Sequence, residues 1–182
     1  MKSFLPSMFY YGFPVVLLTT IDKDGNADVT PISCNFTLGT NAVIALVKLN
    51  KAYHNVMEVP EVVFNLPSAE MWEKVEAIAP YTAQNPVPPQ KVGKYAYTDD
   101  KFAIGGFTQL PSEKVRVPRI AECPIQAEAV VKQVNDRGTY ALIELEFVQV
   151  HAEDHLVMEE NKINPLAWEP LIYNFKHYYG LG

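Results

Sequence analysis

The chain has 182 residues, of which 48% are hydrophobic, 20% charged and 12% aromatic. This composition is typical of a globular protein with enough apolar mass for a core, and it excludes intrinsic disorder and collagen-like structure. Fifteen Lys and Arg against 21 Asp and Glu give a formal net charge of −6. Because no basic stripe accompanies this acidic balance, we expect no nucleic-acid partner. The length predicts a single domain over residues 1–182.

The sequence predicts neither a disulfide framework nor a membrane segment. It contains two cysteines, Cys34 and Cys123, and no CxxC pair that would supply half a zinc site. The uninterrupted apolar run near the N-terminus covers residues 15–18, which is too short for a signal peptide or a membrane span. We therefore expect a cytoplasmic protein without a membrane partner.

The first third of the chain reads as strands at hairpin spacing. Residues 15–21 and 27–32 predict a hairpin around a tight turn at Asp24-Gly25. The apolar run at 42–49 predicts a third strand that is buried on both faces. A short helix over 51–59 follows, closed by Pro60.

The remaining elements continue this pattern. A fourth strand is expected over 61–66 and a one-sided helix over 70–78. Four prolines make 79–98 an excursion or lid without regular structure. Residues 125–134 and 140–150 predict a second, longer hairpin, and the tail from 171 onward is aromatic and extended. Because strands dominate and there is no GxGxxG, a closed or nearly closed antiparallel barrel fits best.

Catalytic side-chain signatures are absent from the sequence. It has no GxSxG elbow, and neither cysteine has a protease-like context. His151 and His155 are four residues apart, which suits a metal on a helix, but they fall at a strand end. A solvated turn is therefore favoured over a ligand pair.

One segment carries a concentration of hydrogen-bonding groups. Residues 30–35 place hydroxyl, thiol and amide groups after a strand, and Lys48 and Lys51 follow one strand later. If the strands pair as neighbours, hydroxyls and backbone N–H groups face one or two ammonium groups, which suits a phosphate. The alternative is a polar loop with two solvated lysines. The six residues are Thr30, Pro31, Ile32, Ser33, Cys34 and Asn35.

Several motifs occur in a characteristic order. PVVLLTTIDKDGNADVTPISCN (14–35) combines an opening strand, a D-x-D-G turn and a Thr/Ser-rich loop, and KLNKAYHNV (48–56) is a basic segment ending in an Asn-aliphatic pair. Next come VVFNLP (62–67), TDDKFAIGGFT (98–108), PRIAECPIQAEAVV (118–131) and the terminal YYGLG (178–182). Their order and spacing resemble those of the flavin reductase-like proteins of the FMN-binding split barrel, which include flavoredoxin-type proteins.

The resemblance implies a homodimeric, six-stranded antiparallel Greek-key barrel that binds FMN near the subunit interface. The phosphate would meet Thr30, Ser33 and Lys51, and also Lys48. The backbone of residues 32–35 would run along the isoalloxazine ring. Lys101 and Phe102 would lie near the cofactor or the dimer seam.

Two departures from the family pattern affect the expected site. Ala52 stands where the family usually has a threonine that contacts phosphate, and Asn41-Ala42 replaces a common proline pair. Asn50 could compensate for the missing hydroxyl. Cys34 would lie beside the flavin, but without a resolving partner it is expected to be a small buried filler.

The same resemblance explains the missing catalytic signature, because flavin itself carries the redox chemistry. The leading hypothesis is an FMN-dependent NAD(P)H:flavin reductase, with NADH or NADPH as donor. The second is a flavoredoxin-type electron carrier that binds FMN and a redox partner protein but has no nicotinamide site. A third is a split-barrel protein that binds another anion, or haem, in the same groove.

Overall fold

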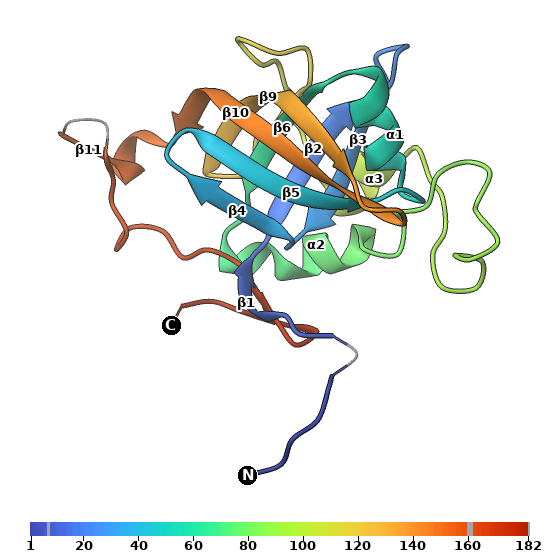
Figure 1. Ribbon diagram of the computed structural model, residues 1–182. Coiled ribbons are helices and arrows are strands. Elements are labelled where there is room, and N and C mark those ends of the chain that lie inside the picture. The colour runs from blue at the N-terminus through green and yellow to red at the C-terminus, as the bar shows by residue number, and fades with distance from the viewer. Residues whose placement is uncertain (7, 160–161, 182) are drawn as a thin grey trace.

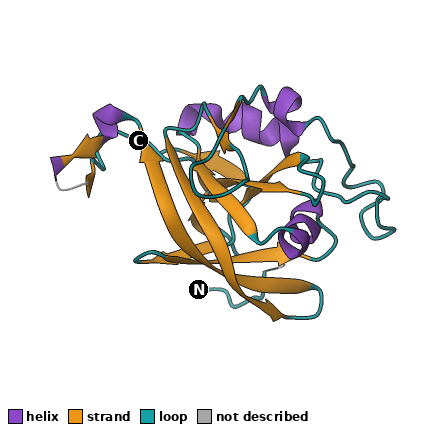
Figure 2. Ribbon diagram, turned by 90° about the horizontal axis from the view of Figure 1, so that it is seen from above, coloured by secondary structure: helices purple, strands orange, loops and turns teal. Residues whose placement is uncertain are grey.

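The computed structural model describes residues 1–6, 8–159 and 162–181, so Gly182 of the terminal motif lies outside the described residues. Its body is a seven-stranded antiparallel sheet in the order β3-β2-β6-β9-β10-β5-β4 (Figure 1). Short helices lie at the periphery of this sheet (Figure 2). The strands are β2 (Val16–Ile21), β3 (Ala27–Ile32), β4 (Asn35–Leu38), β5 (Asn41–Val47), β6 (Glu61–Leu66), β9 (Ile125–Asp136) and β10 (Tyr140–Ala152).

The two outer strands of this sheet are neighbours in the chain. β3 and β4 end the strand order on opposite sides, yet only Ser33 and Cys34 separate them. The Cys34 carbonyl also accepts a hydrogen bond from the backbone N–H of Ala45 in β5, at 3.1 Å. The sheet therefore curls until its ends meet at this loop, which confirms the expected mainly β, antiparallel split barrel.

Two strand predictions need correction. β4 follows the polar loop directly and adds a seventh strand to the six that hydrophobic patterning indicated. β5 is not buried on both faces: Ala42, Ile44 and Leu46 are buried, whereas the intervening side chains are partly exposed. On the second face, Ala45 and Val47 line a cavity, so these apolar side chains are not packed in the core.

Three helices cover the barrel. α1 (Lys51–Glu58) buries Ala52 and Val56 against the barrel core. α2 (Trp72–Ile78), preceded by the 3₁₀ turn η1 (Ala69–Met71), contributes Val75 and Ile78 to a second apolar cluster. α3 (Lys101–Gly105) follows the 79–98 segment, which contains no helix or strand, as expected. No helix in the described parts of the chain is long and apolar enough to cross a membrane.

The chain ends form a separate sheet. β1 (Tyr11–Pro14) pairs with β13 (Ile172–Asn174), which forms a hairpin with β14 (His177–Tyr179). The aromatic tail is thus a hairpin rather than a single extended segment, and it lies beside α2 below the barrel (Figure 1). The short pairs β7 (Gln109–Leu110) with β8 (Arg119–Ile120) and β11 (Val157–Met158) with β12 (Lys162–Ile163), and the 3₁₀ turn η2 (Asp154–Leu156), complete the fold.

Candidate functional site

The polar loop between β3 and β4 lines a cavity of about 430 Å³. Residues 31–34 form one wall, and the end of β5 with Asn50 forms the floor beside it. This volume is in the range of sites that hold one cofactor-sized molecule. The remaining walls come from three distant parts of the chain, represented by Met8, Tyr10, Thr82, Lys91, Tyr173 and Tyr178.

One end of the cavity is built around Lys91. Its ammonium group donates hydrogen bonds to Asn50 Oδ1 and to Thr82 Oγ1, at 2.5 and 3.0 Å, and it lies 4.8 Å from the centre of the Tyr95 ring. The side chain is 7% exposed and its partners are neutral. Burial, helped by the positive charge of Lys101, lowers the pKa of Lys91 to about 8.

Two further lysines lie behind this end and share one carboxylate. Lys101 Nζ is 3.0 Å from each oxygen of Asp28, and both side chains are almost fully buried. Lys101 also donates to Thr30 Oγ1 at 3.3 Å. Lys51 Nζ lies 3.9 Å from Asp28 Oδ1 and 5.3 Å from the ring centre of Tyr97. Burial lowers the pKa of Lys101, while the Asp28 charge raises it. Asp28, Lys51, Lys91 and Lys101 are called the lysine cluster below.

The other end of the cavity is aromatic. Tyr10 and Tyr173 have ring centres 6.0 Å apart, and Tyr173 and Tyr178 are 5.3 Å apart. The Cys34 thiol donates a hydrogen bond to Tyr10 Oη at 3.6 Å, and this contact is the main cause that raises the pKa of Tyr10 to about 12. Cys34 is partly exposed and lines the cavity, so its expected role as a buried filler is wrong.

The other site residues named from the sequence lie outside the cavity wall. Lys48 pairs with Asp136 at 2.5 Å, and Asn35 Nδ2 donates to the Pro14 carbonyl at 3.0 Å. Phe102 packs partly buried against the apolar cluster under α2. Thr30 and Lys101 are buried behind the wall, and Ala52 is fully buried in the barrel core, so a hydroxyl at position 52 would face the core.

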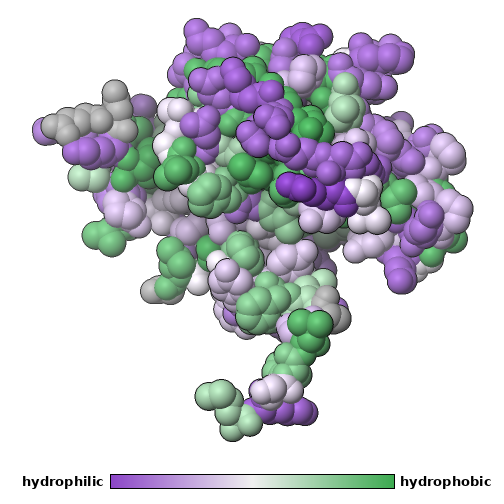
Figure 3. Space-filling model, viewed as in Figure 1, coloured by the Kyte–Doolittle hydropathy of each residue, from purple (hydrophilic) through white to green (hydrophobic). Residues whose placement is uncertain are grey.

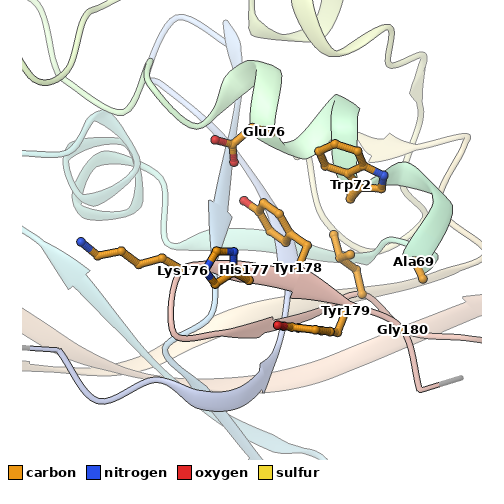
Figure 4. Close-up of a pocket in the computed structure, with 9 residues that line it drawn as sticks. Ala69, Trp72, Glu76, Lys176, His177, Tyr178, Tyr179 and Gly180 are labelled. Atoms are coloured by element: carbon orange, nitrogen blue, oxygen red, sulfur yellow. The ribbon is translucent and has the colours of Figure 1, made fainter.

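A second cavity of about 490 Å³ lies between α2 and the C-terminal hairpin (Figure 4). Trp72 and Glu76 project into it from α2, and His177 lines it from β14. Tyr178 borders both cavities. Burial and the charge of Glu76, with which its hydroxyl is hydrogen-bonded, raise the pKa of Tyr178. Tyr178 is therefore in contact with both cavities.

The histidine pair does not form a metal site. His151 lies within β10 rather than in a solvated turn, and its Nε2 is 2.6 Å from the buried Glu128 carboxylate. The Glu128 carboxylate also accepts hydrogen bonds from the backbone N–H groups of residues 113–115, and these bonds lower its pKa. His155 is exposed, as expected. In the described part of the chain, no three His, Cys, Asp or Glu side chains are grouped to hold a metal ion.

The cavity residues that are distant in sequence from the β3–β4 loop carry no local sequence signal. Lys91 and Thr82 lie in the proline-rich excursion, where no periodicity marks them. Tyr10, Tyr173 and Tyr178 lie near the chain termini, and the aromatic composition of the tail alone indicates contact surface rather than a cavity wall. The segment contains two lysines, Lys91 and Lys94, and no local pattern distinguishes the one that faces the cavity.

Comparisons with known proteins identify the family and the fold of the chain. An uncharacterised protein, YdfE of Bacillus subtilis, is 39% identical over 186 residues, covering 100% of this chain and 89% of the relative. The flavoredoxin of Desulfovibrio vulgaris has a TM-score of 0.82 at 20% identity, covering 100% of this chain and 94% of that one. An FMN-binding protein from Thermus thermophilus has a TM-score of 0.74 at 14% identity, with coverages of 99% and 93%. Residues 8–182 match the family described as flavin reductase like domain, and the chain therefore belongs to the flavin reductase-like family.

Proposed function

We propose that the protein is an FMN-binding oxidoreductase whose cofactor lies in the cavity between the β3–β4 loop, the 79–98 segment and the chain termini. The observation that carries this proposal is the polarity of the cavity. It has a cationic end at Lys91 and an aromatic end at Tyr10, Tyr173 and Tyr178. FMN has the same two parts, a phosphate and a flat aromatic ring system.

The charge of the lysine cluster suits a phosphate monoester. Three ammonium groups and the single carboxylate of Asp28 leave two net positive charges. A phosphate monoester carries about −1.5 to −2 at neutral pH. Ser33, which also lines the cavity, and the neutral partners of Lys91 add hydrogen-bonding groups. We propose contacts to Ser33, Asn50 and Lys91, which line the cavity, and to Lys51, which lies behind its cationic end. Thr30 and Lys101 are buried behind the wall and act indirectly.

The ring system would lie along the backbone of Ile32 and Cys34. The facing wall consists of Tyr10, Tyr173 and Tyr178, which offer aromatic surface to a planar ligand. FMN, when bound, supplies the hydride- and electron-transfer chemistry, so the protein needs no nucleophile or metal of its own. The side chains bind the ring, orient it and exclude water.

We propose NADH or NADPH as the electron donor. The alternative is a flavoredoxin-type carrier that exchanges electrons with a protein partner, and the similarity in fold to the Desulfovibrio flavoredoxin favours it. Anaerobic mixing of the FMN-loaded protein with each nicotinamide separates the two. Rapid bleaching of the flavin absorbance identifies a reductase, and unchanged absorbance with both nicotinamides identifies the carrier.

We also propose that the protein is a homodimer. The N-terminal segment and the C-terminal hairpin expose large apolar side chains, which appear as hydrophobic surface at the base of the molecule (Figure 3). Leu5, Phe9 and Phe175 are 96%, 64% and 47% exposed. Aromatic residues of this kind are enriched at subunit interfaces. Light scattering at micromolar concentration should give twice the chain mass, and a monomer with FMN fully bound would refute this assembly.

Replacing Lys51 tests the cofactor assignment. Loss of a charge-assisted hydrogen bond, worth about 1.5–3 kcal/mol, should weaken FMN binding about 10- to 150-fold in Lys51→Ala. Riboflavin, which lacks the phosphate, should bind with nearly unchanged affinity. Lys48→Ala is the matched control, because Lys48 is paired with Asp136 outside the cavity wall. Equal losses for FMN and riboflavin, or no loss for either, would remove Lys51 from the site.

A further inference from the structure

Lys101 is the most deeply buried member of the lysine cluster. Its side chain is 1% exposed, that of Asp28 is 2% exposed, and neither lines the cavity. Lys101 Nζ lies 3.0 Å from both Asp28 oxygens, so one ammonium group engages the whole carboxylate. Thr30 Oγ1, which donates to Asp28 Oδ2 at 3.2 Å, completes this arrangement.

Lys51 competes for the same carboxylate and is held more loosely. Its Nζ is 3.9 Å from Asp28 Oδ1, which is beyond hydrogen-bond distance. Its backbone N–H donates to the Thr82 carbonyl at 3.3 Å, and Thr82 is also a partner of Lys91. The start of α1 is thereby tied to the cavity end that carries Lys91. The ammonium group of Lys51 contacts Asp28 and the Tyr97 ring only at 3.9 and 5.3 Å, without a hydrogen bond to the carboxylate.

Lys101 lies 3.0 Å and Lys51 3.9 Å from the Asp28 carboxylate, which indicates that the two lysines have different roles. A buried carboxylate needs a cation, because an unpaired buried charge is strongly unfavourable. Without Lys101, the nearest cation for Asp28 would be Lys51. The cluster would then offer the cavity one positive charge fewer, since Lys51 and Asp28 would neutralise each other. Asp22, the other carboxylate near Lys51, accepts hydrogen bonds from Asn26 and from the backbone of Asp24 within its own turn, and these lower its pKa despite partial burial.

We propose that Lys101 is a positioning residue: by occupying both oxygens of Asp28, it keeps Lys51 free for the phosphate of the ligand. This inference rests on the proposed function, because it concerns recognition of FMN at the same cavity. It also explains why a lysine on α3 is buried behind the site rather than exposed in it. Lys101 acts through Lys51 and touches neither the cavity nor its contents.

The experiment is a suppressor test with Lys101→Met and the double variant Asp28→Asn/Lys101→Met. Dissociation constants for FMN and for riboflavin are measured by fluorescence titration at one ionic strength. Lys101→Met should weaken FMN binding by about tenfold, because a net charge is lost near the phosphate, and should leave riboflavin within about twofold. The double variant, which has no carboxylate to capture Lys51, should recover FMN affinity to within about threefold of wild type.

A second readout separates this role from a structural one. The dependence of FMN affinity on salt concentration should be shallower in Lys101→Met and return to the wild-type slope in the double variant. A double variant as weak as Lys101→Met would overturn the proposal, as would an unchanged Lys101→Met. If Lys101→Met does not fold, the double variant is compared with wild type, which has the same net charge in the lysine cluster, and an FMN affinity about tenfold or more below wild type with unchanged riboflavin affinity overturns the proposal. A wild-type protein that binds FMN no better than riboflavin would refute the proposed function instead.

Discussion

The two ends of the cavity are built in opposite ways. The cationic end joins β3, the start of α1 and the 79–98 segment around one buried carboxylate, and its groups are fixed by hydrogen bonds and ion pairs. The aromatic end brings together Tyr10 and two tyrosines of the C-terminal hairpin through the pairing of β1 with β13. We expect the first end to discriminate ligands by charge and the second to offer surface to any planar ring. Phosphate selectivity should therefore depend mainly on the lysines, and general flavin affinity on the tyrosines.

The largest expected effect is at Lys91. Lys91→Met removes an ammonium group whose partners are neutral, so FMN should bind about 10- to 150-fold more weakly, while riboflavin changes by less than about twofold. Isothermal titration of both flavins measures the ratio. Lys94→Met, an exposed lysine of the same segment, is the control. Equal losses of affinity for FMN and riboflavin would show that Lys91 does not recognise the phosphate specifically.

The pH dependence of binding should sharpen the same contrast. Because the pKa of Lys91 is about 8 in the free protein, the group is charged below pH 8 and increasingly neutral above it. FMN binding above pH 8 must then take up a proton, so affinity should fall by up to about tenfold per pH unit as pH rises. Riboflavin binding should stay flat over this range. Titrations at pH 7, 8, 9 and 10 check the slope, which should flatten in Lys91→Met.

A smaller, non-selective effect is expected at the aromatic end. Tyr178→Leu keeps apolar volume but removes the aromatic surface, worth about 0.5–1.5 kcal/mol, so FMN and riboflavin should both bind about 2- to 12-fold more weakly. The FMN-to-riboflavin ratio should not move. Fluorescence titration of the two flavins measures this ratio. A change confined to FMN would contradict the assignment, because it would place the phosphate at the aromatic end of the cavity.

The smallest effect on flavin binding is expected at Ala52. The side chain is fully buried in the barrel core, so Ala52→Thr should not add a phosphate contact, despite the family's usual threonine. Inserting a hydroxyl and a methyl group there should lower the free energy of unfolding by about 1–3 kcal/mol. Denaturant unfolding measures this loss. A selective gain in FMN affinity in Ala52→Thr would instead mean that α1 presents residue 52 to the cavity.

The sequence by itself determined six of the seven barrel strands and one wall of the candidate site. The hairpin at residues 15–32 and the long β9–β10 pair follow from alternating, β-branched runs joined by turn residues, which are local signals. The loop from Pro31 to Cys34 was identified because its polar groups interrupt such a run. Asn50 and Lys51 lie at the start of a helix that Pro60 delimits.

Only the tertiary structure decided which residues complete the cavity around this loop. Lys91 comes from an irregular segment, and the tyrosines are brought together by pairing between the two chain ends, more than 150 residues apart. The tertiary structure also decided where the side chains of residues 48–56 point. Lys48 pairs with Asp136 and Ala52 packs in the core, although both lie in the motif that resembles a phosphate site. Side-chain direction depends on strand register and helix packing, and the pairing of distant segments depends on closure of the whole barrel. Neither is encoded in any local stretch of residues.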